Sequence, residues 1–149
     1  MTLFLTSDFS YFYEGWQVTE EVREEVSTNS YVYGLYIDEA LAMQNNGSNY
    51  YYHADDLYNV VAMTGTNGDV VERYDYDDYG QPTIQYLQPQ ADPSVAEASS
   101  IQNPYLFTGR RYDEKTRLYY YRARYLDSRP GLFTIRDPLE YIYRWDESL

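Results

Sequence analysis

The sequence predicts an all-β fold built from antiparallel hairpins, and three observations support this prediction. Tyrosine is the most unusual residue, with 21 copies in 149 residues, and its ring packs well on a pleated, half-buried surface. Runs in which Tyr or Val alternates with other residues recur along the chain, and this is the period of a strand. Gly and Asn-Gly pairs separate the runs and predict tight turns. The length suits a single domain, 1–149, with its own core.

The first part of the chain contains two extended runs. Residues 11–13 and 16–19 predict a strand pair around a turn or bulge at Glu14-Gly15. Residues 20–26 fit either a helical turn or a charged strand, and residues 31–37 predict a strand whose Gly34 indicates a bulge.

The clearest hairpin lies in the middle of the chain. Residues 60–64 and 70–76 read as two strands, and Asn67-Gly68 between them favours a type I′ turn. A further turn is expected at residues 77–80, which end in Gly80.

The second part of the chain begins after a stretch of different composition. Residues 88–103 are rich in Pro, Gln, Ala and Ser and predict a long loop or hinge between an acidic part, 1–87, and a second part, 104–149. Residues 118–126 predict the longest strand, with Tyr119, Tyr121, Ala123 and Tyr125 on one face. A short helix is expected only at 139–147.

Charge is unevenly distributed. The net charge is −13 overall, with −15 in residues 1–100 and +2 in residues 101–149. One interpretation is that the two parts touch and complement each other, and the alternative is a separate anion site in the basic part. The acidic excess argues against general binding to nucleic acid, since phosphates would be repelled.

Three stretches resemble the C-terminal core region of RHS/YD-repeat proteins. Residues 74–80, Tyr-Asp-Tyr-Asp-Asp-Tyr-Gly, are similar to the family's Tyr-Asp…Gly unit, and residues 103–113 to the segment that opens its core. Residues 118–127, with Phe133 and Arg136-Asp137-Pro138, resemble its end. The resemblance implies a curved, partial shell of β-hairpins, part of an enclosing cocoon, with a structural or interaction role and no enzymatic activity. It also implies an alternative, an aspartyl autoprotease that releases a C-terminal polypeptide, often a toxin.

The autoprotease alternative depends on a pair of carboxylates that share a proton. The candidates are Asp137 with either Asp113 or Glu114, and Arg124 is a candidate partner for the ionised carboxylate. The structural alternatives to a catalytic role are that Asp113 is a turn residue and that Asp137 caps a helix. Because Glu140 and Tyr141 follow Asp137-Pro138-Leu139 in place of the family's usual residues, we expect the chain not to cleave itself. A third hypothesis is a carbohydrate-binding module that uses exposed Tyr rings.

Other chemistry finds little support in the sequence. The chain has one His and no Cys, so we expect neither a metal site nor a cofactor. Expected partners are other protein repeats, an enclosed polypeptide, a second copy of the chain bound through an uncovered sheet edge, or carbohydrate. Nucleic acid and membrane insertion are not expected. The compartment stays open between the cytoplasm and export within a larger protein, because no signal peptide is recognised.

The expected core contains residues on the apolar side of the predicted strands. These are Trp16, Tyr33, Val61, Phe107, Tyr119, Tyr121 and Phe133.

Overall fold

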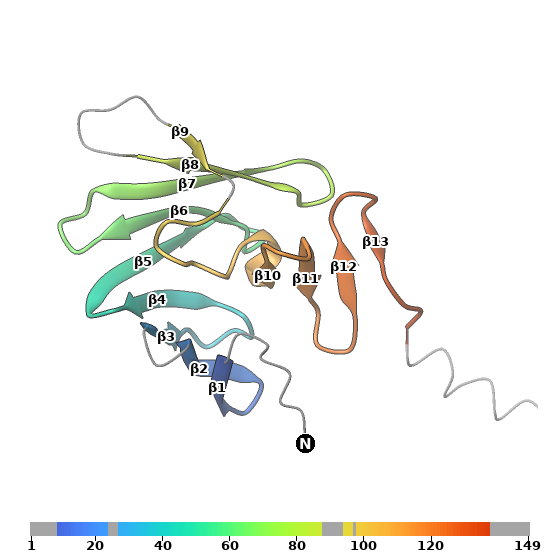
Figure 1. The fold of residues 1–149 in the computed structure, drawn as a ribbon, viewed down its shortest axis with the longest axis horizontal. Helices are drawn as coiled ribbons and strands as arrows, with labels where there is room; N and C mark the ends of the chain where they lie inside the picture. The colour runs from blue at the N-terminus through green and yellow to red at the C-terminus, as the bar shows by residue number, and fades with distance from the viewer. Residues whose placement is uncertain (1–8, 24–26, 88–93, 97, 138–149) are drawn as a thin grey trace, which may run out of the picture.

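The computed structural model describes residues 9–23, 27–87, 94–96 and 98–137, and these form two antiparallel sheets (Figure 1). The first sheet is a meander in which each strand pairs with the next along the chain. Its nine strands are β1 (Phe9–Glu14), β2 (Gln17–Arg23), β3 (Ser27–Tyr33), β4 (Ala40–Asn45), β5 (Ser48–Ala54), β6 (Val60–Gly65), β7 (Val70–Tyr76), β8 (Pro82–Tyr86) and β9 (Ser94–Ala96). The all-β prediction is therefore confirmed.

The second sheet is smaller and its strands are short. After a 3₁₀ turn, η1 (Phe107–Gly109), it contains β10 (Arg111–Asp113), β11 (Leu118–Tyr120), β12 (Tyr125–Asp127) and β13 (Leu132–Phe133). The yellow-orange segment that joins the two sheets runs along the inner side of the curved first sheet before β10 begins (Figure 1).

The core lies between the inner face of the first sheet and this joining segment. Inward-facing residues of successive strands alternate with exposed ones, as in β7, where Glu72 and Tyr74 are buried while Arg73 and Asp75 are exposed. The buried apolar side chains come from both sheets and from the joining segment. They are Val18, Tyr31, Met43, Val60, Met63, Tyr74, Ile84, Ile101, Tyr105, Leu106, Tyr112, Tyr119 and Leu126.

A buried carboxylate fixes the joining segment to the first sheet. Glu72 of β7 is fully buried and accepts hydrogen bonds from the Tyr74 hydroxyl, the Ser99 hydroxyl (2.8 Å), both the amide and hydroxyl of Ser100 (2.6 Å each) and the Ile101 amide (3.3 Å). Several donors replace water around the charge, which makes its burial tolerable. The stretch predicted as a loop, 88–103, thus contains strand β9 and ends in buried contacts.

Two local predictions differ from the structure. The run 118–126 forms two paired strands, β11 and β12, because Arg122 adopts a left-handed conformation (φ 60°) and turns the chain between them. The prediction that Tyr119, Tyr121, Ala123 and Tyr125 share one face of a single strand is therefore wrong. The type I′ turn predicted at Asn67-Gly68 is wrong, because that turn needs a positive φ at both central residues and only Gly68 has one. Asn46 (φ 46°) and Gly47 (φ 84°), between β4 and β5, both have a positive φ.

Other element predictions can be compared directly. The hairpin of residues 60–64 and 70–76 is confirmed as β6 and β7, and the pair around Glu14-Gly15 as β1 and β2. Residues 20–23 are strand, not helix, and β3 ends at Tyr33, so residues 34–37 form a loop. The helix expected at 139–147 lies outside the described residues.

The predicted core is partly wrong. Tyr119 is fully buried, and Tyr33, Phe107 and Tyr121 are half-buried against the core. Trp16 (77% exposed), Val61 (39%) and Phe133 (38%) are exposed. Trp16 lies at the tip of the β1–β2 hairpin, beyond the packed strands, and Val61 follows a register shift that turns it to the outer face.

Candidate functional site

A cleft of about 350 Å³ opens between the β1–β2 hairpin and the second sheet. We call it the inter-sheet cleft. One wall belongs to the first sheet and the other to the second sheet and the segment before it. Its lining consists of Tyr11, Tyr13, Trp16, Gln17, Val18, Tyr33 and Asp38 on the first side and Tyr105, Gly109, Arg110, Arg111, Asp113, Leu118, Tyr120, Arg122 and Tyr125 on the second.

Exposed aromatic rings are the main feature of this cleft. Trp16 is 77% exposed and Tyr13 60% exposed, and both project from the tip of the β1–β2 hairpin. On the opposite wall, Tyr120 and Tyr125 are exposed and form a cross-strand pair, with 5.5 Å between their ring centroids. Exposed rings on both walls can hold a planar group between or against them.

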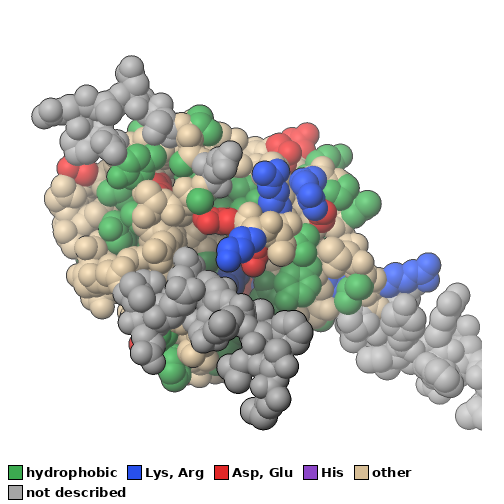
Figure 2. All heavy atoms as spheres, in the orientation of Figure 1, with side chains coloured by type: hydrophobic (Ala, Val, Ile, Leu, Met, Phe, Trp, Pro, Cys, Tyr) green, Lys and Arg blue, Asp and Glu red, His purple; other side chains and the backbone are tan. Residues whose placement is uncertain are grey.

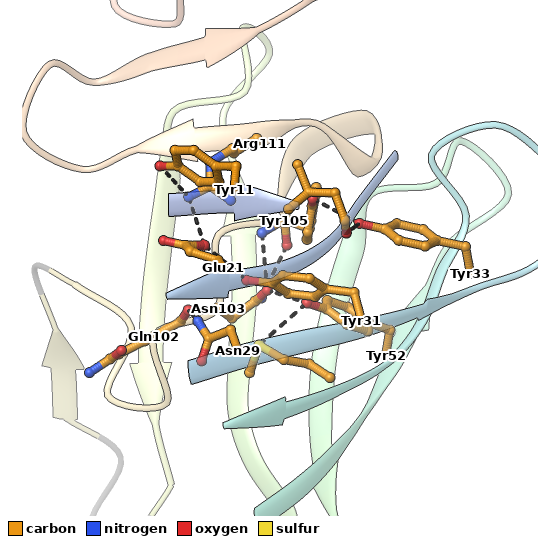
Figure 3. Close-up of polar contacts among 12 residues, drawn as sticks. Tyr11, Glu21, Asn29, Tyr31, Tyr33, Tyr52, Gln102, Asn103, Tyr105 and Arg111 are labelled. Atoms are coloured by element: carbon orange, nitrogen blue, oxygen red, sulfur yellow. Dashed lines mark hydrogen bonds and ion pairs between the residues drawn. The ribbon is translucent and has the colours of Figure 1, made fainter. Parts of the chain in front are cut away.

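Arg111 crosses the cleft and joins the two sheets. Its Nη2 lies 2.9 Å from the Glu21 Oε2 of β2 and donates to the Tyr11 hydroxyl at 3.2 Å, while its guanidinium stacks 4.9 Å from the Tyr11 ring centroid. Figure 3 shows Arg111 directed at Tyr11 and Glu21 from the strand above them. Glu21 is only 2% exposed and also accepts from the Tyr31 hydroxyl at 3.2 Å.

The pKa values around Arg111 follow from this arrangement. Burial alone would lower the pKa of Arg111, but the nearby carboxylate of Glu21 outweighs that effect and raises the pKa above its ordinary value. Burial, together with the Glu21 charge, raises the pKa of Tyr31 well above its ordinary value. The arginine is therefore cationic and the tyrosine neutral at physiological pH.

Asp38 clamps two further arginines at the base of the cleft. Arg110 Nη1 lies 2.6 Å from the Asp38 Oδ2, and Arg122 Nη2 donates to both carboxylate oxygens at 2.8 Å. Two cations share one carboxylate, so this trio carries a net charge of +1. Figure 2 shows Lys and Arg side chains gathered on this face of the molecule, with acidic and hydrophobic side chains beside them.

Backbone strain concentrates around the same trio. Asp38 (φ 71°), Thr108 (φ 51°) and Arg122 (φ 60°) all have left-handed conformations that cost energy for residues other than Gly. At Gly109 (φ 65°), a Cβ would lie 2.6 Å from the Asp38 carbonyl oxygen, so only glycine fits. Strained residues of this kind cluster at functional sites, where the surrounding structure holds them in place.

Two buried guanidinium nitrogens in the cleft lack an acceptor. Arg110 Nε and Arg111 Nη1 are buried and make no hydrogen bond within the described part of the chain. An unsatisfied buried donor is costly, and in native proteins such groups often have a ligand or other functional explanation. Because both nitrogens are covered by protein atoms, they do not face the open cleft, and the feature of the cleft that suits a planar ligand is its exposed rings.

The four residues predicted as catalytic are not all brought together. Arg124 Nη2 lies 3.3 Å from the Asp137 Oδ2, so these two form an ion pair. Asp113 lines the inter-sheet cleft and accepts from the Thr116 amide at 2.8 Å, as a turn residue does, whereas Glu114 accepts from the Ser99 amide at 2.9 Å. Their catalytic role stays a prediction that these contacts do not test.

The inter-sheet cleft was missed at the sequence level, although one signal pointed to it. The basic second part was interpreted either as a partner of the acidic part or as an anion site. The ion pairs of Arg110, Arg111 and Arg122 with Asp38 and Glu21 confirm that the two parts touch and complement each other. The exposed Trp16 was assigned to the core, so the rings and the arginines were not considered together.

The described residues contain neither a membrane-spanning helix nor a cluster of metal ligands. Within residues 9–23, 27–87, 94–96 and 98–137, no helix is long and apolar enough to cross a membrane. In the same ranges, no cluster of three or more His, Cys, Asp and Glu side chains is placed to hold a metal ion.

Comparison with known proteins identifies similar sequences in Bacillus. The chain is 34% identical over 132 residues to the tRNA3(Ser)-specific nuclease WapA of Bacillus spizizenii. It is 35% identical over 132 residues to the tRNA(Glu)-specific nuclease WapA of Bacillus subtilis subspecies natto, and 34% identical to the tRNA nuclease WapA of Bacillus subtilis. Each match covers 87% of this chain but only 5% of the relative. No family model matches the chain.

These relatives overturn several predictions made from the sequence. The assignment to an RHS repeat-associated core is wrong, because the similar proteins are named WapA tRNA nucleases and no family model supports that core. The non-enzymatic shell, the autoprotease and the carbohydrate-binding module are likewise contradicted by relatives named as nucleases. The exclusion of nucleic acid is also wrong, since these names specify tRNA. Most of this chain therefore corresponds to a short section of WapA tRNA nucleases.

Proposed function

We propose that this chain is part of a tRNA nuclease related to WapA and that it contacts the RNA through the inter-sheet cleft. The observation that carries the proposal is the 34–35% identity over 87% of the chain to three proteins named tRNA nucleases. The exposed rings of the cleft support the choice of surface.

The chemistry of the cleft fits unpaired nucleotides. Proteins that bind single-stranded RNA stack the splayed bases on aromatic rings and satisfy base acceptors with nearby donors. Trp16 and Tyr13 offer exposed rings on one wall, and Tyr120 and Tyr125 offer exposed rings on the other. A base in the cleft would have a ring to stack on from either wall.

The overall charge constrains how such binding works. A chain with a net charge of −13 does not attract RNA over long distances, so phosphate contacts contribute little. The trio of Asp38, Arg110 and Arg122 provides one surplus positive charge. For Z neutralised phosphates, the slope of log K against log salt is about −0.7Z on single strands, so we expect a slope of roughly −1 or shallower.

Fluorescence anisotropy of labelled tRNA tests this proposal. Trp16→Ala should weaken binding about 5-fold or more, because base stacking on an aromatic ring contributes about 1–3 kcal/mol. Tyr51→Ala is the matched control: it removes an exposed ring from the outer face of the same sheet and should leave binding unchanged. Equal losses for both variants, or a steep salt slope, would contradict binding in the cleft, and absence of binding would contradict the proposal as a whole.

A further inference from the structure

A second candidate site lies next to Ala54, at the loop end of the β5–β6 hairpin, and Asp38 lines both this site and the inter-sheet cleft. Three hairpins of the first sheet, β3–β4, β5–β6 and β7–β8, turn at the same end of the sheet, and in each the last residue before the loop pairs with the first residue after it. These pairs are Tyr33 with Ala40, Ala54 with Val60, and Tyr76 with Pro82. Ala54 stands where the two flanking hairpins have Tyr.

The tyrosines at this position follow a rule in their hydrogen bonding. The Tyr33 hydroxyl donates to the Val18 carbonyl at 2.7 Å, and the Tyr76 hydroxyl donates to the Val60 carbonyl at 2.7 Å. Each acceptor lies at the start of the strand that follows the loop of the preceding hairpin at that end: Val18 is the second residue of β2 and Val60 is the first residue of β6. Applied to position 54, the rule names the Ala40 carbonyl as the acceptor.

The three loops differ in length, with six residues in β3–β4 and five in β5–β6 and β7–β8, but they re-enter the sheet in the same way. In each, the residue two positions before the next strand is left-handed: Asp38 (φ 71°), Tyr58 (φ 63°) and Gly80 (φ 86°). Asp55 and Asp77 open two of these loops, and each accepts from the amides two and four residues later. The position of residue 54 is therefore the position that a tyrosine occupies in the neighbouring hairpins.

A cavity lies where the missing ring would be. It has a volume of about 240 Å³ and is lined by apolar groups that include Ala40, Tyr52, Ala54 and Val60, with Asp38 and Asp55 at its polar side. A cavity of about 150 Å³ already admits benzene in another protein. The available space is thus sufficient for a single phenol ring.

We propose that this cavity binds a tyrosyl side chain supplied by another polypeptide, with the phenol hydroxyl donating to the Ala40 carbonyl. The ring would restore the contacts that Tyr33 and Tyr76 make in the flanking hairpins. The acidic groups beside the cavity disfavour an anion such as phosphotyrosine or a nucleotide, so the occupant differs in class from the RNA proposed for the inter-sheet cleft.

Binding of small probes tests the site in the intact chain. N-acetyl-tyrosinamide should perturb the NMR signals of residues around Ala54 and bind about 5-fold more tightly than N-acetyl-phenylalaninamide, since a neutral hydrogen bond contributes about 1 kcal/mol. A short tyrosine-containing peptide should bind at least as well as the amide. Binding of p-cresol without any binding of the peptide would overturn a polypeptide source, and equal affinity for both amides would overturn the phenol contact.

A matched pair of variants gives the second readout. Ala54→Tyr should fill the cavity, raise the melting temperature and abolish probe binding, while leaving tRNA binding unchanged. Ala42→Tyr places the same ring on the outer face of the sheet, beside Tyr51, and should leave probe binding intact. A lower melting temperature for Ala54→Tyr with undiminished probe binding would show that the ring does not belong there. If Ala54→Tyr fails to fold, the comparison of the two amides on the unmodified chain decides the question.

Discussion

The two sheets of this protein are fixed by different side chains. In the first sheet, Tyr33 and Tyr76 reach from one hairpin to the carbonyl of the hairpin before it, and Tyr31 and Tyr74 donate to buried carboxylates. The second sheet and the segment before it are held largely by arginines, through the pairs of Arg110 and Arg122 with Asp38 and of Arg111 with Glu21, and also by Tyr119, whose hydroxyl donates to the Gly80 carbonyl at 2.8 Å.

The tyrosine hydrogen bonds and the arginine ion pairs depend differently on pH and salt. Neutral hydroxyl bonds do not depend on salt but fail when the phenol ionises. Ion pairs survive high pH, because arginine stays charged, but exposed pairs are weakened by salt. Salt therefore acts mainly on the arginine pairs, whereas high pH acts on the buried tyrosines of both sheets.

The largest expected effect is alkaline unfolding. Burial raises the pKa of Tyr31, Tyr33, Tyr52, Tyr74, Tyr76, Tyr105 and Tyr119 above 10. These groups stay protonated in the folded protein while the unfolded chain ionises, so stability is complete below pH 10 and is lost above it. Each group removes about 1.4 kcal/mol per pH unit, and seven together remove roughly 10 kcal/mol per unit.

That slope exceeds the stability of most domains, about 5–15 kcal/mol, within one to two pH units. Tyrosinate absorbance should therefore contain a steep component above pH 10 that coincides with the loss of sheet signal in circular dichroism. Ionisation of all 21 tyrosines while the sheet signal is retained would mean that the buried rings are accessible to solvent and do not stabilise the fold.

The second largest effect is expected for Asp38→Asn, which weakens the ion pairs of Arg110 and Arg122. Asp38→Asn keeps a residue that tolerates the left-handed backbone but removes the charge shared by Arg110 and Arg122. We expect a loss of about 2 kcal/mol in the free energy of unfolding, typical of hydrogen bonds to charged groups. Asp56→Asn, an exposed acid in the neighbouring loop, is the control for urea denaturation, and similar losses for both would remove the role assigned to Asp38.

A smaller effect is expected for single tyrosine hydroxyls. Tyr76→Phe removes the bond to the Val60 carbonyl and should cost about 1 kcal/mol. Tyr36→Phe, on an exposed ring that stacks on Tyr58, should leave the denaturation midpoint in place. No loss for Tyr76→Phe would show that water replaces the hydroxyl without cost.

The smallest effect is expected for Arg129. Its ion pair with Asp127 (2.6 Å) lies at the surface, and Arg129 is 56% exposed. Exposed pairs of this kind contribute little, so Arg129→Ala should not change the melting temperature at any salt concentration. A clear decrease would mean that surface pairs, and not only the Asp38 clamp, stabilise the second sheet.

The sequence was sufficient to predict two hairpins of the first sheet, β1–β2 and β6–β7. Their residues alternate with period two, and local turns such as Glu14-Gly15 mark where each strand ends. The second sheet was harder, because the left-handed turn at Arg122 depends on Asp38, 84 residues earlier in the chain. No local pattern in residues 118–126 reveals that contact.

The candidate sites show the same limit. The inter-sheet cleft needs Trp16 and Arg111 to meet, and neither residue is distinctive in its own stretch of sequence. Burial of Trp16 was expected from its apolar character, yet its place at a hairpin tip leaves it exposed. The cavity at Ala54 could have been found by aligning its hairpin with those that end at Tyr33 and Tyr76, where the missing ring is visible as a difference between neighbouring hairpins.

Ultraviolet cross-linking of tRNA to the chain, followed by mass spectrometry of the attached peptides, tests the central claim most directly. We expect adducts on the rings of the inter-sheet cleft, Tyr13, Trp16, Tyr120 and Tyr125, and their loss when unlabelled tRNA competes. Adducts on outer-face rings such as Tyr51 instead, or no adducts at any tRNA concentration, would contradict the claim that this chain contacts RNA through the cleft.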